Sequence, residues 1–176
     1  MANSIPTLAS LEMQPYLVDG ALPSELDGKV GIYAIFDQDQ TLQYVGFSRN
    51  VNVGLVQHLV RRPEQCHWFK VYTVERPSRT LLDDIRNTWL AEYGDIPSGN
   101  SDTQVAWEKP IDAKTFMTEA ERHEIDNADP TEINKLLKQV ARRVEVDVKA
   151  KVEARGAQMP IKFNPKLKEQ GILALK

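Results

Sequence analysis

The chain has 176 residues, a length typical of one domain with an appendage, and its 41% hydrophobic residues are enough to bury a core. No apolar run of about 18 residues occurs, which predicts no membrane helix, and Met1–Glu12 lacks the basic and apolar regions of a secretory signal. The single cysteine, Cys66, allows no disulfide within one chain and predicts a reducing, cytoplasmic location.

The net charge of −3 is unevenly distributed along the chain. Residues 1–27 hold four acidic and no basic side chains, and we interpret them as an acidic lead-in. Residues 28–100 are neutral, residues 101–130 are acidic, and residues 131–176 carry eleven basic and five acidic side chains. Because phosphate binding normally needs a basic surface, this distribution weakens a nucleic-acid interpretation of the middle segment.

Two strands and a helix are predicted after the lead-in. Residues 29–36 (KVGIYAIF) and 41–47 (TLQYVGF) are rich in β-branched and aromatic residues and flank a polar turn. This pattern is typical of a β-hairpin. Ser48 is a candidate helix N-cap, and apolar side chains at helical spacing predict a helix over 50–62, which Pro63 ends.

A third strand and a second helix complete the predicted first domain. Residues 67–75 alternate along a strand, and residues 79–93 carry apolar side chains every three or four positions before Gly94. The polar loop at 95–103 predicts a boundary, so we assign a domain to 28–100. Its predicted fold class is α/β, with a small three-stranded antiparallel sheet flanked by helices.

Residues 101–176 are predicted to form a helical extension. A short strand is expected at 104–109, and Thr118 with Glu121 forms a capping-box pattern for a short helix. A long basic helix with clear capping signals follows at 129–156, and the tail beyond it is expected to be extended, either docked or loose. The helix either binds a nucleic acid or an acidic protein partner, or it packs by its apolar stripe with solvated charges, and we favour the latter.

Short motifs lie within the predicted strand–strand–helix order. The triplet GIY occupies 31–33, YVG occupies 44–46, and His58 follows in the first helix, while Pro97 and Asn100 follow the second helix. This pattern resembles the GIY-YIG nuclease superfamily, and it is closest to the GIY-YIG-like N-terminal domain of the chloroplast monothiol glutaredoxins of plants. The resemblance covers 29–100 and implies that Gly31, Gly46 and Asn100 are structural motif residues.

The resemblance implies a hydrolase, namely a Mg²⁺-dependent endonuclease that acts on DNA. In the family the motif tyrosines orient or deprotonate the attacking water, so Tyr33 and Tyr44 are the candidate catalytic residues, together with His58 as a contact to the phosphate or leaving group. If residues 38 and 39 form the turn of the hairpin, Tyr33 and Tyr44 lie directly opposite each other. Cleavage would also need a cation to stabilise the developing charge.

Two positions depart from the family pattern. Gly54 stands where the family has a phosphate-binding arginine, and Arg49, Arg61 or Arg62 would have to replace it from other angles of the helix. Arg86 stands where the family has its metal-binding glutamate, which leaves Asp83 as the candidate metal ligand. A weak or degenerate nuclease is therefore expected. A weak nuclease would use Mg²⁺ as its cofactor, whereas a degenerate site would bind no metal.

A non-catalytic protein-interaction or redox-regulated module is the alternative function. It would use the 129–156 helix, and Cys66 if the module is redox-regulated. Each candidate site residue also has a structural interpretation: the tyrosines as half-buried strand residues, His58 as a surface residue, and Asp83 as a carboxylate favoured near a helix start.

Overall fold

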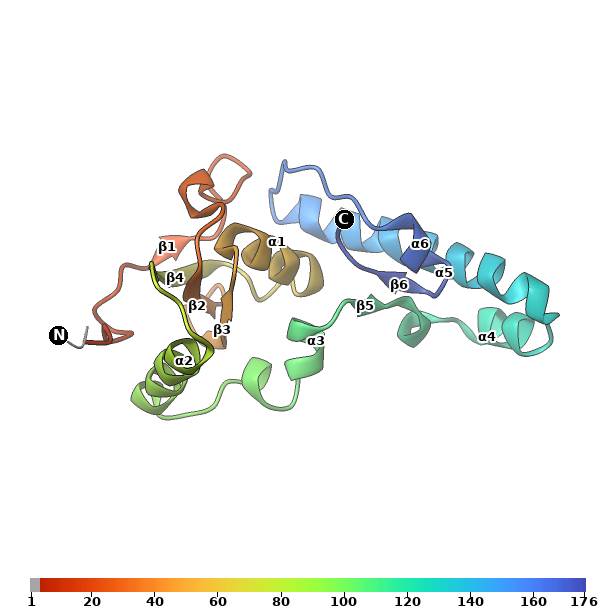
Figure 1. Cartoon of the computed structure of the whole chain (residues 1–176). Helices are drawn as coiled ribbons and strands as arrows, with labels where there is room; N and C mark the ends of the chain where they lie inside the picture. Colours follow the sequence, from red (N-terminus) through yellow and green to blue (C-terminus); the bar gives the residue numbers. More distant parts are fainter. Residues whose placement is uncertain (1–3) are drawn as a thin grey trace. The chain divides into compact units, whose positions relative to one another are not determined.

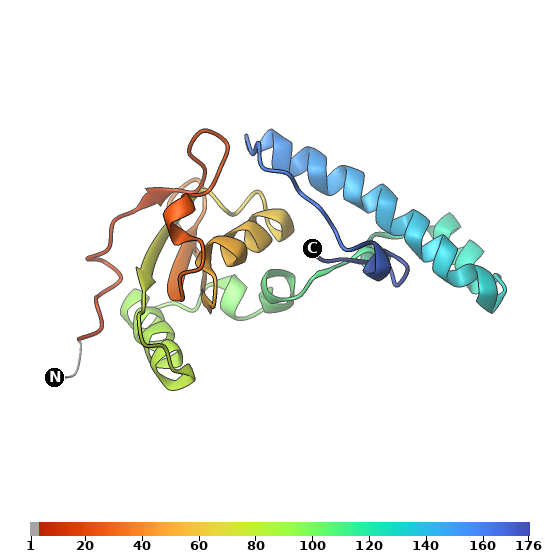
Figure 2. The same cartoon turned by 45° about the horizontal axis from the view of Figure 1, so that its top comes forward.

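A computed structural model describes residues 4–176, and the chain divides into two compact units, one ending at Glu108 and one beginning at Lys109. Figures 1 and 2 show the helices and strands of both units. No helix within residues 4–176 is both long and apolar enough to cross a membrane.

The first unit is built on an antiparallel sheet with the strand order β1-β4-β2-β3. These strands are β1 (Gln14–Pro15), β2 (Gly31–Phe36), β3 (Leu42–Ser48) and β4 (Trp68–Thr73). The predicted α/β class with a small antiparallel sheet is confirmed, but the sheet has four strands. The lead-in adds a two-residue edge strand whose Pro15 is tolerated there, because an edge strand needs fewer backbone donors.

The register of the hairpin differs from the expected one. Tyr33 pairs with Gly46 and Tyr44 pairs with Ile35, so the prediction that the two tyrosines lie directly opposite each other is wrong. The turn is displaced because the Asp37 carboxylate accepts hydrogen bonds from two backbone N–H groups within it, and the register shifts at a bulge after Ile35. Both tyrosines still share one face of the sheet, since side chains alternate along a strand.

Two helices pack on the sheet of the first unit: α1 (Val51–Arg61) and α2 (Arg79–Tyr93). The N-cap of α1 is Asn50, whose side chain accepts from the N–H of Val53, so the assignment of the cap to Ser48 is wrong. The Ser48 hydroxyl instead bonds to the backbone of Asn50. The apolar stripe of α2 packs on one face of the sheet in a core that includes Ile32, Ala34, Val45, Leu82, Ile85 and Trp89.

The segment after α2 closes the first unit through η2 (Ser98–Asn100) and α3 (Gln104–Glu108). The Asn100 side-chain amide accepts from the Val45 N–H and donates to its carbonyl, both at 2.8 Å, so it pairs with β3 as a neighbouring strand would. The predicted strand at 104–109 is wrong. Exposed Val105 and buried Trp107 imitate strand alternation, but they lie on opposite sides of a short helix.

The second unit is predominantly helical, as predicted for the C-terminal extension. Its capping box at Thr118 and Glu121 and its long helix are confirmed. The tail is docked, because its last strand pairs with a strand near the start of the unit. The elements are β5 (Ile111–Asp112), η3 (Ala113–Phe116), α4 (Glu119–Asp126), α5 (Pro130–Ala154), α6 (Pro165–Lys168) and β6 (Ile172–Leu173), and the lead-in of the first unit adds η1 (Ser24–Leu26).

Candidate functional site

The three candidate catalytic side chains lie together in the first unit. The Tyr33 hydroxyl oxygen is 2.8 Å from Nε2 of His58, and the ring centroids of Tyr44 and His58 are 4.8 Å apart. His58 is only 4% exposed, so the interpretation of this histidine as a surface residue is wrong. Tyr33 and Tyr44 are also buried, with ring centroids 6.5 Å apart.

Two glycines make room for this cluster. A Cβ atom on Gly54 would lie 3.0 Å from the Tyr33 hydroxyl oxygen, so the missing side chain lets α1 approach β2 closely. A Cβ atom on Gly46 would collide with the Tyr44 ring, which leans over that glycine. Gly31, by contrast, is at the start of β2, paired with Ser48 and Thr73.

Helix α3 adds two side chains that the sequence interpretation missed. Trp107 stacks on Tyr44 with ring centroids 5.1 Å apart and planes 7° from parallel. Glu108 accepts a hydrogen bond of 3.0 Å from the Tyr44 hydroxyl through Oε1, and its Oε2 accepts from Gln104. These residues were missed because the segment was expected to be a strand, and no motif in the sequence links them to the tyrosines.

Three arginines line a cavity of about 460 Å³ beside the tyrosine and histidine side chains. Arg61 comes from the last turn of α1 and donates a 2.8 Å hydrogen bond to the Trp107 carbonyl. Arg79 and Arg86 come from α2, and both guanidinium groups lie over the Phe47 ring. The remaining lining residues are Tyr33, Tyr44, Phe47, Ser48, Gly54, Gln57, His58, Gln104 and Glu108. Of the arginines considered on or beside the first helix, Arg61 therefore reaches the cavity.

The residues around this cavity do not fit a magnesium ion. Asp83 forms ion pairs with Arg79 at 3.3 Å and Arg86 at 2.8 Å, and it is not among the residues that line the cavity. Glu108 already accepts hydrogen bonds from Tyr44 and Gln104. Within residues 4–176, no three His, Cys, Asp or Glu side chains gather as a metal site would require. Mg²⁺ prefers several oxygen ligands, whereas guanidinium groups repel it.

Burial controls the protonation of the cluster. Burial, as the larger cause, and the nearby Arg61 charge together lower the pKa of His58 to about 3. Burial also raises the pKa of Tyr33 and of Tyr44 above the ordinary tyrosine value. At neutral pH the imidazole is therefore uncharged and both phenols keep their protons, so the positive charge of the cavity comes from arginines.

The arrangement favours binding of an anion. The neutral Tyr33–His58 pair adds no negative charge to the cavity. Guanidinium groups present paired N–H donors that match phosphate oxygens. Three guanidinium groups at one cavity therefore suit a phosphate group.

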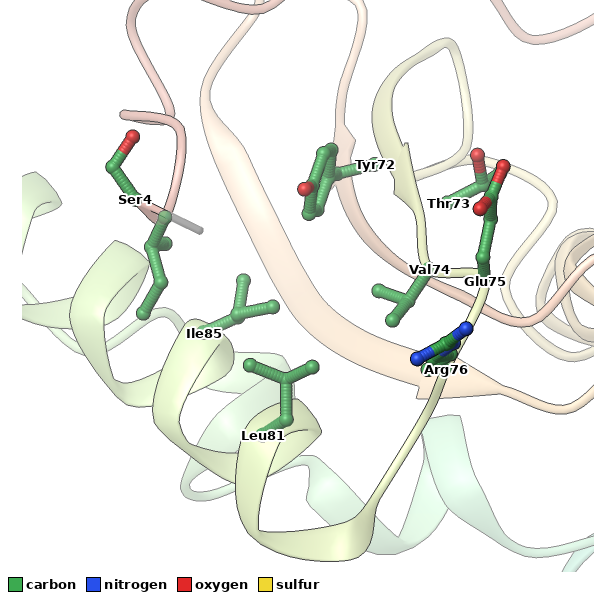
Figure 3. A pocket seen from close by; sticks show the side chains of 9 residues that line it. Ser4, Tyr72, Thr73, Val74, Glu75, Arg76, Leu81 and Ile85 are labelled. Carbon is green, nitrogen blue, oxygen red and sulfur yellow. The ribbon is translucent and has the colours of Figure 1, made fainter. Parts of the chain in front are cut away.

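Another hollow of the first unit, of about 530 Å³, contains none of these residues. It lies between the N-terminal segment, the end of β4 and α2, and Figure 3 shows Tyr72, Val74, Leu81 and Ile85 around it. Its charged side chains, Glu75 and Arg76, both follow β4. Cys66 is fully buried. Neither this hollow nor the cysteine belongs to the candidate site.

Part of the chain is similar to a known protein. No protein-family model matches the chain. The chain is 33% identical over 104 residues to the bifunctional monothiol glutaredoxin-S16 of Arabidopsis thaliana, a chloroplast protein. The match covers 57% of this chain and 34% of the relative, so the chain spans about a third of that protein. The chain is thus similar to a chloroplast monothiol glutaredoxin over part of its length.

Proposed function

We propose that the first unit is a GIY-YIG-type domain that binds the phosphodiester backbone of DNA and has weak or no endonuclease activity. The observation that carries the proposal is the cavity that Arg61, Arg79 and Arg86 line beside the Tyr33–His58 pair. The two motif tyrosines and His58 support the GIY-YIG assignment, because they gather in one cluster although they come from three different elements.

Weak or absent cleavage follows from the chemistry of the same cavity. Hydrolysis needs a base that takes a proton from water and a cation that stabilises the developing charge. The pKa of His58, lowered to about 3, makes its imidazole a poor base, and the raised pKa of Tyr33 keeps its phenol protonated. The loss of one electrostatic stabiliser lowers a rate by about two to three orders of magnitude, and the residues present do not fit Mg²⁺.

Fluorescence anisotropy with a labelled short DNA tests the binding. Arg61→Gln is expected to weaken binding about 10-fold, since a hydrogen bond to a charged group contributes about 1.5–3 kcal/mol. Arg76→Gln is the matched control, because it removes the same charge from an exposed position of the same unit outside this cavity. Equal losses in the two variants would contradict a specific role for the cavity.

A plasmid-nicking assay with Mg²⁺ and with EDTA tests the cleavage. Wild type, Tyr33→Phe and His58→Ala are all expected to be close to background. Nicking by wild type that needs Mg²⁺ and disappears in Tyr33→Phe would show that the active nuclease has been retained, and it would overturn the degenerate assignment.

A protein-interaction function of the second unit is a second candidate. The observation that favours it is Val146 on α5, which is 67% exposed on a helix otherwise rich in charged residues. Crosslinking in an extract with wild type and Val146→Asp tests this function, with Ile96→Asp as a control at an equally exposed apolar residue of the first unit. An identical set of crosslinked partners in all three would count against it. Thiol exchange at Cys66 is disfavoured, because the residue is fully buried.

A further inference from the structure

A second hollow adjoins the arginine cavity. It has a volume of about 410 Å³ and shares Phe47 and Arg79 with that cavity. Apolar side chains from three segments, Val30, Pro77 and Leu82, line it together with Phe47, and polar atoms are contributed by Arg49, Ser78 and Arg79. A charged cavity and a largely apolar hollow thus lie next to each other, with Phe47 and Arg79 in the wall of both.

A nucleotide has the same two parts, a charged phosphate and a flat, mostly apolar base. Proteins that bind single strands pair a basic groove with aromatic or guanidinium surfaces on which bases stack. Here the guanidinium of Arg79 lies 5.4 Å from the centroid of the Phe47 ring, and both residues line both hollows. The shared residues can therefore contact a phosphate on one side and a base on the other.

We propose that this apolar hollow receives the base of an unpaired nucleotide whose phosphate occupies the arginine cavity. The inference rests on the proposed function and names its ligand class, single-stranded or frayed DNA. A base within a duplex is stacked between its neighbours and offers no free face to the hollow. Arg49 and Ser78 supply hydrogen-bond donors for a base edge at the polar rim. An apolar side chain of a protein partner would fit the hollow but would bring no anion to the adjoining cavity, where one Asp83 carboxylate pairs with both arginines of α2 and Arg61 has no ion-pair partner within residues 4–176.

Three labelled ligands of equal length test the inference by anisotropy: single-stranded oligothymidylate, the same backbone with abasic sites, and a duplex. Wild type is expected to bind oligothymidylate about 5- to 150-fold more tightly than the abasic strand, because stacking contributes about 1–3 kcal/mol per base. It is also expected to bind the single strand more tightly than the duplex.

Pro77→Glu tests the hollow itself, because Pro77 is exposed and does not line the arginine cavity. Thr80→Glu is the matched control, with the same added charge at an exposed position of the α2 start outside both hollows. Pro77→Glu is expected to reduce the preference for oligothymidylate over the abasic strand by at least about fivefold, whereas Thr80→Glu leaves that preference unchanged.

The outcomes separate the two proposals. Equal affinity of wild type for the base-bearing and abasic strands, or tighter binding of the duplex, would overturn the base site while phosphate binding stands. Equal effects of the two glutamate substitutions on the preference would overturn it too. If wild type binds none of the three ligands more tightly than Arg61→Gln does, the proposed function itself fails and the base site fails with it.

Discussion

The Tyr33 hydroxyl and Nε2 of His58, 2.8 Å apart, join β2 to α1 at a buried hydrogen bond. The bond is next to Gly54, where any side chain would press on the Tyr33 hydroxyl. Gly54 is thus part of the packing that brings the phenol and the imidazole together. The positive charge of the cavity comes from Arg61 and from two arginines of α2.

The burial of neutral His58 predicts that acid destabilises the fold. The folded-state pKa, about 3, is below the unfolded value of about 6.5, so unfolding takes up a proton in the window between them. The stability is fully present above pH 6.5 and decreases as the pH falls towards 3. At pH 5 the free energy of unfolding is expected to be about 2 kcal/mol lower than at pH 7 from this group alone.

Urea unfolding at the two pH values measures this effect. His58→Gln is expected to reduce the difference between pH 7 and pH 5, whereas His123→Gln, at an exposed histidine of α4, leaves it unchanged. If His58→Gln does not fold, NMR titration of wild type decides: an imidazole of His58 that takes up its proton near pH 6.5 would contradict the prediction.

Gly54→Ala is expected to lower stability although alanine is the better helix former. Alanine gains about 1 kcal/mol over glycine inside a helix, but its Cβ would lie 3.0 Å from both the Tyr33 hydroxyl oxygen and the Ser48 Cβ. Overpacking in a core costs about 1–3 kcal/mol, so a net loss of about 1 kcal/mol is expected in urea unfolding. A gain of about 1 kcal/mol would instead indicate that Tyr33 moves away freely. Asn87→Ala on α2 is a control for the effect of alanine alone.

Asn100→Ala should loosen α3 from the sheet. The Asn100 amide makes two hydrogen bonds of 2.8 Å to the backbone of Val45. Their loss leaves the N–H and the carbonyl of Val45 unpaired, which is expected to lower the free energy of unfolding by about 1–3 kcal/mol. Because Trp107 follows in α3 and stacks on Tyr44, its fluorescence should change at the same time. Ser101→Ala is the neighbouring control. Unchanged stability and fluorescence in Asn100→Ala would show that the amide does not hold this segment.

Much of the fold follows from local sequence patterns. The alternation in 29–36 and 41–47 and the capping signals of the long helix correspond to observed elements, because burial and capping there depend on nearby residues. Residues 104–109 were assigned wrongly, since five helical residues carry little periodicity and Trp107 is buried by tertiary packing against Tyr44. The edge strand at Gln14–Pro15 depends on pairing with a distant strand, which local pattern does not encode.

The candidate site was predictable only in part. The short motifs of the sequence located Tyr33, Tyr44 and His58, which lie on the neighbouring elements β2, β3 and α1. Arg79 and Glu108 were not predicted, since their approach depends on how α2 and α3 pack on the sheet. The ion pairs of Asp83 with Arg79 and Arg86 are local instead, since the three residues are four and three positions apart on α2.

The variant Asp83→Asn distinguishes two roles of this carboxylate, as an ion-pair partner of the cavity arginines or as a ligand of Mg²⁺. The Asp83 carboxylate pairs with Arg79 and Arg86 and offsets their charge, so its neutralisation is expected to tighten DNA binding about two- to fivefold, as a partly exposed ion pair contributes about 0.2–1 kcal/mol. Anisotropy with and without Mg²⁺ measures the change. If Asp83 ligated Mg²⁺ instead, the substitution would weaken binding, and only when Mg²⁺ is present.

The salt dependence of DNA binding tests phosphate binding by the cavity most directly. Each phosphate contact that is lost lowers the slope of log affinity against log salt by about one. Arg86→Gln is therefore expected to weaken binding and to reduce the slope by about one, whereas Arg76→Gln should retain the wild-type slope. Equal slopes for wild type and Arg86→Gln would contradict the assignment of this cavity to the DNA phosphate.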